Sequence, residues 1–322
     1  MNADLANALF LAGPTAVGKS AVALALAKRL DGEIISVDSM QVYRGLDIGT
    51  AKPSPAERAR VPHHLIDVAE LTESFDAAQF VRLATAAARD IQARGRTPVF
   101  CGGTGLYFKA LLAGLGETPA ADPALRAGLE ATPLAELLAE LAARDPEAFA
   151  RIDRQNPRRV VRAIEVIRLT GRPFSAQRAD WASVSATGNA RPLPGVLCLR
   201  RATDDLRQRI ATRAEAMFAA GLVAETERLL ARGLAQNRTA MQAIGYRQVV
   251  EHLRGGRGLT ETIALVKQRT AQFARRQMTW FRQQLPVRWL ELAPTASPDA
   301  VAAEILAWRR AQPTVASAAT VD

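Results

Sequence analysis

In the first 115 residues, short apolar segments alternate with longer segments that have the hydrophobic spacing of helices. The apolar segments have the length and continuous hydrophobic character of strands buried on both faces of a parallel sheet. The predicted strands are residues 8–12, 34–37, 64–68 and 97–101. The predicted helices are residues 19–30, 76–94 and 105–113. This alternation predicts an α/β fold, in which helices cover the faces of a parallel sheet.

The pattern changes between residues 119 and 190, where helical segments are separated by breaks that contain Pro and Asp. The last of these segments has clear boundaries. Asn156 is a typical N-cap residue, Pro157 suits the first helical position and Gly171 follows the end. We therefore predict a first part of the core over residues 1–118 and a helical insertion domain over residues 119–190.

Apolar runs at residues 195–199 and 287–292 predict two further strands, the second at an edge of the sheet. The helical patterns that surround them predict a second, mostly helical part of the core over residues 191–313. These helices are expected at residues 204–232, 239–254 and 260–285. Residues 314–322 are expected to form a disordered tail.

A phosphate-binding pattern lies between the first predicted strand and the first predicted helix. Its sequence, GPTAVGKS, matches G-x-x-x-x-G-K-[ST]. The glycines allow a turn whose N–H groups point inward at the positive end of the next helix, where phosphate oxygens bind. Lys19 brings a positive charge to the phosphates, and the Ser20 hydroxyl is a ligand for Mg²⁺. The predicted diphosphate-binding residues are Gly13, Pro14, Thr15, Ala16, Val17, Gly18, Lys19 and Ser20.

Two further chemical groups follow predicted strands. Asp38 comes after the second strand, and Thr104 lies in a Gly-Gly-Thr-Gly turn after the fourth. In open α/β sheets, ligands bind at the carboxyl ends of the strands. Asp38 is therefore a candidate general base, with a turn or helix cap as the alternative role. The Thr104 hydroxyl and nearby amides are candidates to stabilise a departing diphosphate.

Composition narrows the classes of partner and location. The net charge of +10 favours a polyanionic partner, although a generally basic protein gives the same value. The two cysteines, Cys101 and Cys198, form no closely spaced ligand pair, so neither a zinc site nor a disulfide framework is expected. No stretch reaches the roughly 20 apolar residues of a membrane span. We expect a cytoplasmic protein that does not bind membranes.

Taken in order along the chain, several segments resemble the tRNA dimethylallyltransferase (isopentenyltransferase) family. The resemblance covers about residues 8–293, and the ordered combination is far more specific than any single segment. The segments are GPTAVGKS, DSMQVYRGLDIGTAKP, PHHLIDV, GGTGLY, NPRRVVRAIEV, GYRQ and RQMTWFR.

The resemblance implies a P-loop core like that of nucleotide kinases, which binds dimethylallyl diphosphate where a kinase would bind the phosphates of a nucleotide. It implies transfer of the dimethylallyl group to N6 of adenosine 37, beside the anticodon of tRNA, with release of diphosphate. By residue matching, it assigns catalysis to Asp38, Thr104 and Lys19, and recognition of the base to Gln41.

The resemblance also implies which residues contact the anticodon stem-loop of tRNA, and that the helical insertion domain faces it. These residues are Asp38, Ser39, Met40, Gln41, Thr104, Arg126, Gln155, Asn156, Pro157, Arg158, Arg159, Gln242, Ala243, Ile244, Gly245, Tyr246 and Arg247.

Two predicted helices carry clustered arginines. In residues 157–170, apolar positions recur at helical spacing and leave a basic face, which either contacts RNA phosphates or is simply solvated. In residues 267–282, basic residues are interleaved with Phe273, Trp280 and Phe281, a composition that suits RNA. Aromatic residues on a long helix are more often part of the core, so these three are not assigned to a site.

Three other functions fit parts of this pattern. An isopentenyltransferase that acts on free adenine nucleotides shares the core, but it has less need of basic helices. A small-molecule kinase shares the phosphate loop and transfers a phosphoryl group. A non-enzymatic RNA-binding protein does not need both an intact phosphate loop and Asp38. We expect a monomeric tRNA-modifying enzyme.

Overall fold

The computed structural model describes residues 5, 7–116, 118–177 and 195–311. Contacts divide the chain into two compact units. Met1–Leu112 and Pro192–Asp322 belong to the first, called here the core unit, and Ala113–Arg191 to the second, the helical unit. The predicted tail over residues 314–322 lies outside the described residues, as does the end of the predicted insertion domain.

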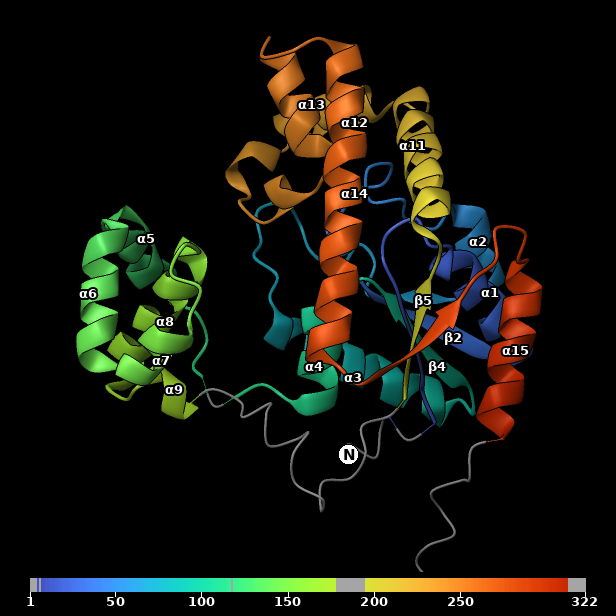
Figure 1. Cartoon of the computed structure of the whole chain (residues 1–322), viewed down its shortest axis with the longest axis horizontal. Coiled ribbons are helices and arrows are strands. Elements are labelled where there is room, and N and C mark those ends of the chain that lie inside the picture. Colours follow the sequence, from blue (N-terminus) through green and yellow to red (C-terminus); the bar gives the residue numbers. More distant parts are fainter. Residues whose placement is uncertain (1–4, 6, 117, 178–194, 312–322) are drawn as a thin grey trace, which may run out of the picture. The chain divides into compact units, whose positions relative to one another are not determined.

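A parallel sheet forms the centre of the core unit (Figure 1). It has six strands in the order β3-β2-β4-β1-β5-β6, and every neighbouring pair is parallel. The strands are β1 (Leu9–Ala12), β2 (Gly32–Val37), β3 (His63–His64), β4 (Thr97–Gly102), β5 (Val196–Arg200) and β6 (Val287–Glu291). The α/β class is therefore confirmed, with β6 at the predicted edge.

The predicted strand over residues 64–68 is wrong in its extent. Only His63 and His64 pair with β2. Leu65 and Asp67 have positive φ angles of 61° and 57°. This left-handed conformation is incompatible with a strand, so the extended pairing ends at His64.

Helices surround the sheet of the core unit. They are α1 (Lys19–Arg29), α2 (Pro55–Arg60), α3 (Ala77–Ala93), α4 (Gly105–Ala113), α11 (Thr203–Ala219), α12 (Leu222–Ala231), α13 (Tyr246–Leu253), α14 (Leu259–Gln284) and α15 (Pro298–Arg310). The predicted helix over residues 204–232 is two helices, because Gly221 has a φ of 98° between them. The segment predicted over 239–254 starts as a 3₁₀ turn, Ala240–Gln242, and becomes α13 only after Gly245.

Alternate residues of the strands build two cores, one on each face of the sheet. Leu9 and Leu11 pack in the core that contains the buried residues of α1 and α15. Phe10 and Ala12 pack in the larger core, to which α3, α4, α12, α13 and Phe281 of α14 contribute. The period of two in strand side chains thus gives a three-layer arrangement. Among the described residues, no helix has the length and apolar character needed to cross a membrane.

The helical unit has its own hydrophobic core. Its helices are α5 (Pro123–Ala131), α6 (Leu134–Arg144), α7 (Pro146–Arg151), α8 (Pro157–Thr170) and α9 (Phe174–Gln177). The boundaries predicted for α8 are confirmed, since the Asn156 side chain accepts from the Arg159 amide, Pro157 is the first helical residue and Gly171 ends the helix with a φ of 69°. The predicted apolar face of α8 is buried in this core.

One buried ion cluster lies at the end of the sheet opposite to the carboxyl ends of the strands. Glu33, near the start of β2, is 2% exposed. Its carboxylate accepts from Arg94 Nη2 at 2.8 Å and from Arg96 Nη1 at 3.0 Å, and it lies 2.6 Å from His64 Nε2. Burial alone would raise the pKa of Glu33, but these hydrogen bonds outweigh it and lower the pKa to about 2.

We expect Glu33→Gln to lower the free energy of unfolding by about 2 kcal/mol at pH 7, since charged hydrogen bonds are lost while the side-chain volume is kept. Because the folded-state pKa is depressed, this stabilisation is present above the unfolded pKa of about 4.5 and is lost as the pH falls toward 2. Urea unfolding of both proteins between pH 7 and 3 measures the difference. A control is Glu291→Gln, whose half-exposed pair with Arg200 contributes little. A difference that stays constant down to pH 3 would contradict this account.

Candidate active site

Three adjacent strands bring the predicted chemical groups to one edge of the sheet. Gly13 follows β1, Asp38 follows β2 and Gly103 follows β4. Since β2, β4 and β1 are neighbours and parallel, their carboxyl ends lie side by side. The phosphate loop, the candidate base and the Gly-Gly-Thr-Gly turn therefore meet where ligands bind in open α/β folds.

The phosphate loop has the backbone that its glycines allow. Gly13 and Gly18 have φ angles of 157° and 103°, and Ala16 adopts a left-handed φ of 65°. Gly18 is the residue before α1, so the loop ends at the positive end of that helix. Lys19 Nζ donates to the Pro14 carbonyl at 3.2 Å, which folds its ammonium back over the loop.

Positive charge concentrates around this loop beyond what the pattern of residues 13–20 predicts. Burial lowers the pKa of Lys19, and nearby Arg213 lowers it further, while Asp38 acts in the opposite direction. Burial also lowers the pKa of Arg213 on α11, against the attraction of Asp38. An anion bound beside these two cations would relieve their unfavourable burial.

Two more arginines that the sequence reasoning missed contact the loop from outside. Arg201 Nε donates to the Val17 carbonyl at 2.8 Å, and Arg209 Nε donates to the Ala16 carbonyl at 2.9 Å. Both come from the segment that follows β5. A signal was present, because a strand end beside β1 is a place from which side chains reach this loop.

One oxygen of Asp38 holds its own turn. Oδ1 accepts from the amides of Met40 at 2.8 Å and Gln41 at 3.3 Å. Within the part of the chain that the structure describes, no hydrogen bond engages the other oxygen, Oδ2. The sequence left two alternative roles for Asp38, a general base and a residue that stabilises a turn. The structure makes them compatible, because Oδ1 stabilises the turn and Oδ2 is available to act as a base.

Thr104, in the Gly-Gly-Thr-Gly turn after β4, links this turn to the Asp38 turn after β2. Its Oγ1 accepts from the Ser39 amide at 3.1 Å, and its own amide donates to the Val37 carbonyl at 3.2 Å. The preceding Gly102 lies so close to β2 that a Cβ there would stand 2.0 Å from the Val37 oxygen. Glycine is required at this position, and it places Thr104 directly against the Asp38 turn.

The amide of Gln41 is fixed by neighbours on both sides. Ser36 Oγ donates to its Oε1 at 2.8 Å, and its Nε2 donates to the Thr50 carbonyl at 3.2 Å. The turn that carries Thr50 is held in its place by buried Glu225, which accepts from the Ile48 amide at 3.0 Å. Gln41 thus has a defined orientation before any ligand binds.

The segment over residues 242–247, expected to contact tRNA, is partly internal. Gln242 and Arg247 are exposed and Ile244 is half-buried, whereas Ala243 and Gly245 are buried. The Tyr246 ring is fully buried, and its hydroxyl donates to Glu225 Oε1 at 2.6 Å and accepts from the Gly49 amide at 3.0 Å. The side chain of Tyr246 faces the interior, so it supports the Gly49 turn from inside.

The other residues expected to contact tRNA lie in the helical unit. Gln155, Pro157, Arg158 and Arg159 are exposed at the start of α8, and Asn156 caps that helix. Arg126 on α5 pairs with buried Glu165 at 2.5 Å. Two other arginines of the basic face of α8 are also paired within this unit. They are Arg162, with Glu165, and Arg168, with Glu140.

A cavity of about 1220 Å³ lies in the core unit between the loop that follows Arg44 and helix α11. It is bordered both by Arg213 and by Ala51. Besides the Thr50 carbonyl, the Ala51 carbonyl also accepts from Gln41 Nε2. Its apolar lining includes Ile48, Ala216 and Met217. Among the described residues, no group of three or more His, Cys, Asp and Glu side chains could hold a metal ion.

Comparison with known proteins identifies the family. A family model described as IPP transferase matches residues 41–284 of this chain. The chain belongs to the IPP transferase family. A tRNA dimethylallyltransferase of Halorhodospira halophila is 50% identical over 285 residues, which are 87% of this chain and 91% of that protein. The tRNA dimethylallyltransferase 1 of Trichlorobacter lovleyi is 46% identical over 286 residues, covering 88% and 92%. The predicted family and class of enzyme, a tRNA dimethylallyltransferase, are therefore confirmed.

Solved structures of IPP transferases support the same conclusion. The tRNA isopentenylpyrophosphate transferase of Bacillus halodurans has a TM-score of 0.69 and 38% identity, covering 95% of this chain and 96% of that one. A eukaryotic dimethylallyltransferase acting on tRNA has a TM-score of 0.77 and 25% identity, covering 95% and 80%. The predicted P-loop core with a parallel sheet is confirmed.

We expect Asp38→Asn to reduce turnover about 10²- to 10⁴-fold, the range for a lost general base. The amide oxygen still accepts from Met40 and Gln41, so the turn and the affinity for tRNA are expected to change little. Single-turnover alkylation of tRNA, together with tRNA binding, measures both quantities. Asp38→Ala, which also removes the turn contacts, is the comparison. A near-wild-type rate for Asp38→Asn would exclude Asp38 as the base.

Proposed function

We propose that this enzyme transfers the dimethylallyl group of dimethylallyl diphosphate to N6 of adenosine 37 in tRNA and releases diphosphate. The observation that carries the proposal is the meeting of a phosphate loop and the unengaged oxygen of Asp38 at one sheet edge. A kinase also uses a base for its acceptor hydroxyl, so this geometry fits both an alkyl transfer and a phosphoryl transfer. Membership of the IPP transferase family supports the alkyl transfer.

The donor diphosphate is proposed to bind the loop over residues 13–20. Lys19 and Arg213 are half-buried cations that an anion would compensate. Their charge stabilises the diphosphate more as the allylic C–O bond breaks, because negative charge grows on the leaving oxygen. Thr104 is proposed to contact the same departing group from the opposite loop.

The loop also fits Mg²⁺. This ion keeps several waters and binds through few protein ligands plus substrate phosphates. The hydroxyl of Ser20, at the start of α1 and exposed, would be the protein ligand. The absence of a carboxylate cluster among the described residues agrees with an ion held mainly by the diphosphate. Bound Mg²⁺ would neutralise charge on that leaving group.

The acceptor amine is proposed to face Asp38 and Gln41. The N6 nitrogen attacks the allylic carbon, the bond from that carbon to the diphosphate oxygen breaks, and a proton of N6 passes to Asp38 Oδ2. Gln41 Oε1 keeps a lone pair beside its bond from Ser36, with which it would accept a hydrogen bond from the N–H that N6 retains. The adenine must leave its stack to reach this edge. Positioning accounts for most of the rate.

The tRNA partner is proposed to contact both units through its anticodon stem-loop. In the core unit, the candidates are Asp38, Ser39, Met40, Gln41, Thr104 and the exposed members of residues 242–247. In the helical unit, they are Arg126 and residues 155–159. Their mixture of exposed arginines and capping groups is typical of phosphate contacts, which position RNA without reading its sequence. We propose that the enzyme acts in the cytoplasm as a monomer.

One assay separates this function from its two rivals. The protein is incubated with radiolabelled dimethylallyl diphosphate, Mg²⁺ and either tRNA or AMP, and N6-modified adenosine is measured by mass spectrometry. We expect modified adenosine in tRNA and little or none from AMP. Preferential modification of AMP would indicate an enzyme of free nucleotides. A parallel reaction contains ATP in place of dimethylallyl diphosphate, and phosphoryl transfer there without alkylation in the first reaction would indicate a kinase.

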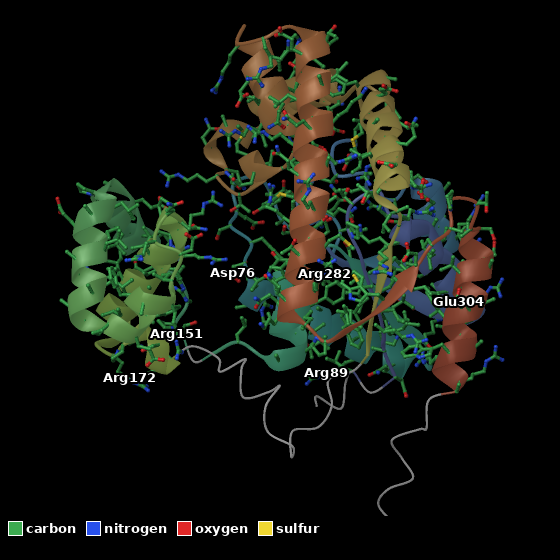
Figure 2. The ribbon with its side chains drawn as sticks, viewed as in Figure 1. Asp76, Arg89, Arg151, Arg172, Arg282 and Glu304 are labelled. Atoms are coloured by element: carbon green, nitrogen blue, oxygen red, sulfur yellow. The ribbon has the colours of Figure 1, made fainter. Side chains whose placement is uncertain are left out.

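We expect the double variant Arg158→Ala/Arg159→Ala to weaken tRNA binding broadly, because both side chains are exposed at the start of α8. Each lost phosphate contact reduces the slope of log K against log salt by about 0.7 to 0.9. Filter binding over a salt series measures this slope, and donor affinity, measured separately, should not change. The control is Arg151→Ala, on α7 of the same unit (Figure 2). Arg151 pairs there with Glu147. An unchanged slope in a folded double variant would show that this face is only solvated.

A further inference from the structure

The candidate active site has three loops, which are the phosphate loop, the Asp38 turn and the Gly-Gly-Thr-Gly turn. Gln277 connects the first of these loops to the third. It lies on α14 and is 7% exposed. Its Oε1 accepts from the amide of Thr15, in the phosphate loop, at 2.9 Å. Its Nε2 donates to the carbonyl of Gly103, in the turn after β4, at 2.8 Å. One side chain therefore bridges segments that are far apart in the sequence.

We propose that Gln277 is a positioning residue for the donor, which sets the spacing between the phosphate loop and the turn of Thr104. This inference rests on the proposed function, because it assumes that the loop holds the diphosphate. Gln277 itself does not contact the reacting atoms in this proposal. Both of its polar ends are already engaged by backbone groups.

The packing shows how tightly this spacing is specified. A Cβ at Gly103 would lie 2.3 Å from Gln277 Nε2, and a Cβ at Gly105 would lie 2.1 Å from the ring of Trp280, one turn further along α14. Real Cβ contacts are not that short, so a larger residue at either position would force the Gln277 amide or the Trp280 ring to move. The close approach brings the Gln277 amide within reach of both loops.

The chemistry of an amide suits this bridge. Glutamine offers a donor and an acceptor in one planar group, which match a carbonyl on one side and an N–H on the other. A carboxylate would keep the bond to Thr15 but oppose the Gly103 carbonyl, and it would place a negative charge beside the diphosphate. An aliphatic side chain would leave two backbone groups without partners.

The bridge continues to the candidate base. Thr104 follows Gly103, and its hydroxyl accepts from the Ser39 amide next to Asp38. Gln277 and Thr104 thus link the phosphate loop, the turn and the Asp38 segment in series. A displacement of the phosphate loop relative to Asp38 would separate the allylic carbon from the amine, and about 1 Å of such displacement can cost roughly a hundredfold in rate.

The test compares two variants of α14 that lose the same chemical group. Gln277→Met removes the bridge with little change in volume. Gln284→Met removes an amide two turns away, whose Oε1 accepts from Lys109 Nζ at 2.9 Å and which touches none of the three loops. For each variant, we would measure kcat and KM for dimethylallyl diphosphate and for tRNA, the melting temperature, and donor binding by isothermal titration calorimetry.

We expect Gln277→Met to lower kcat/KM for the donor about tenfold to a hundredfold. The KM for tRNA should match that of Gln284→Met, which keeps near-wild-type kinetics. The melting temperature should fall by a few degrees relative to that control, because two backbone groups lose their partners. Gln277→Glu should retain the fold and lose donor affinity, because of its charge. A donor kcat/KM within twofold of the control, or equal losses for donor and tRNA, would overturn the proposal.

A double-mutant cycle tests the contact directly. Gly103→Ala should impair donor use strongly in the wild-type background, where its Cβ meets Gln277. In a Gln277→Ala background, the same change should cost less than threefold, because the space has been opened. Additive effects would contradict the bridge. Lys19→Ala serves as the separate check of the donor site, since unchanged donor affinity in that variant would refute the proposed function itself and not only the role of Gln277.

Discussion

The pairing of β4 between β2 and β1 is the constraint on which the candidate active site depends. Gly102 is in register with both Val37 and Ala12, and its lack of a Cβ permits the close approach to β2. Because the strands are parallel and end together, the phosphate loop, Asp38 and Thr104 start from nearly the same level. No long side chain is needed to bring them together. The chemistry is therefore a consequence of the register of three buried strands, to which the two cores on either face contribute the stability.

Electrostatics explains why this edge is suited to a diphosphate. Lys19 and Arg213 are half-buried close to Asp38, which compensates only part of their charge. Two cations and one carboxylate leave a net positive site in a region of low dielectric constant, where an anion is attracted more strongly than in water. The same arrangement keeps Asp38 close to positive charge without a direct ion pair among the described residues. A carboxylate in that position can accept a proton and still hold its turn with the other oxygen.

The sequence predicts the elements whose signals are local. Strand length and apolar character predict β1, β2, β4, β5 and β6, and capping residues predict the boundaries of α8. The motif predicts the phosphate loop, and the strand ends predict that Asp38 and Thr104 share its edge. Failures arise where conformation depends on distant partners. The residues after His64 turn left-handed where Asp67 meets Lys52 and Arg58, a tertiary contact that no local pattern announces.

Long-range side chains were the hardest part of the site to predict. Arg201 and Arg209 reach the phosphate loop from beyond β5, and Arg213 lies near enough to influence Lys19. Their place after a strand end was a signal, but nothing in their spacing distinguishes them from the many other arginines of this basic chain. Helix α15 was missed although Ser297 and Pro298 carry the same start signal as Asn156 and Pro157.

Tyr246 is a residue for which the sequence misleads in the opposite direction. Resemblance marks its segment as functional, yet its side chain is internal and acts with Glu225 on the Gly49 turn. Because the carbonyl of Thr50 in that turn orients Gln41, a buried residue far along the chain can influence the base recognition proposed for Gln41 without touching the base. A functional motif thus contains residues that are placed to contact the substrate and residues that support them from the interior. Only the three-dimensional contacts distinguish these two kinds of residue.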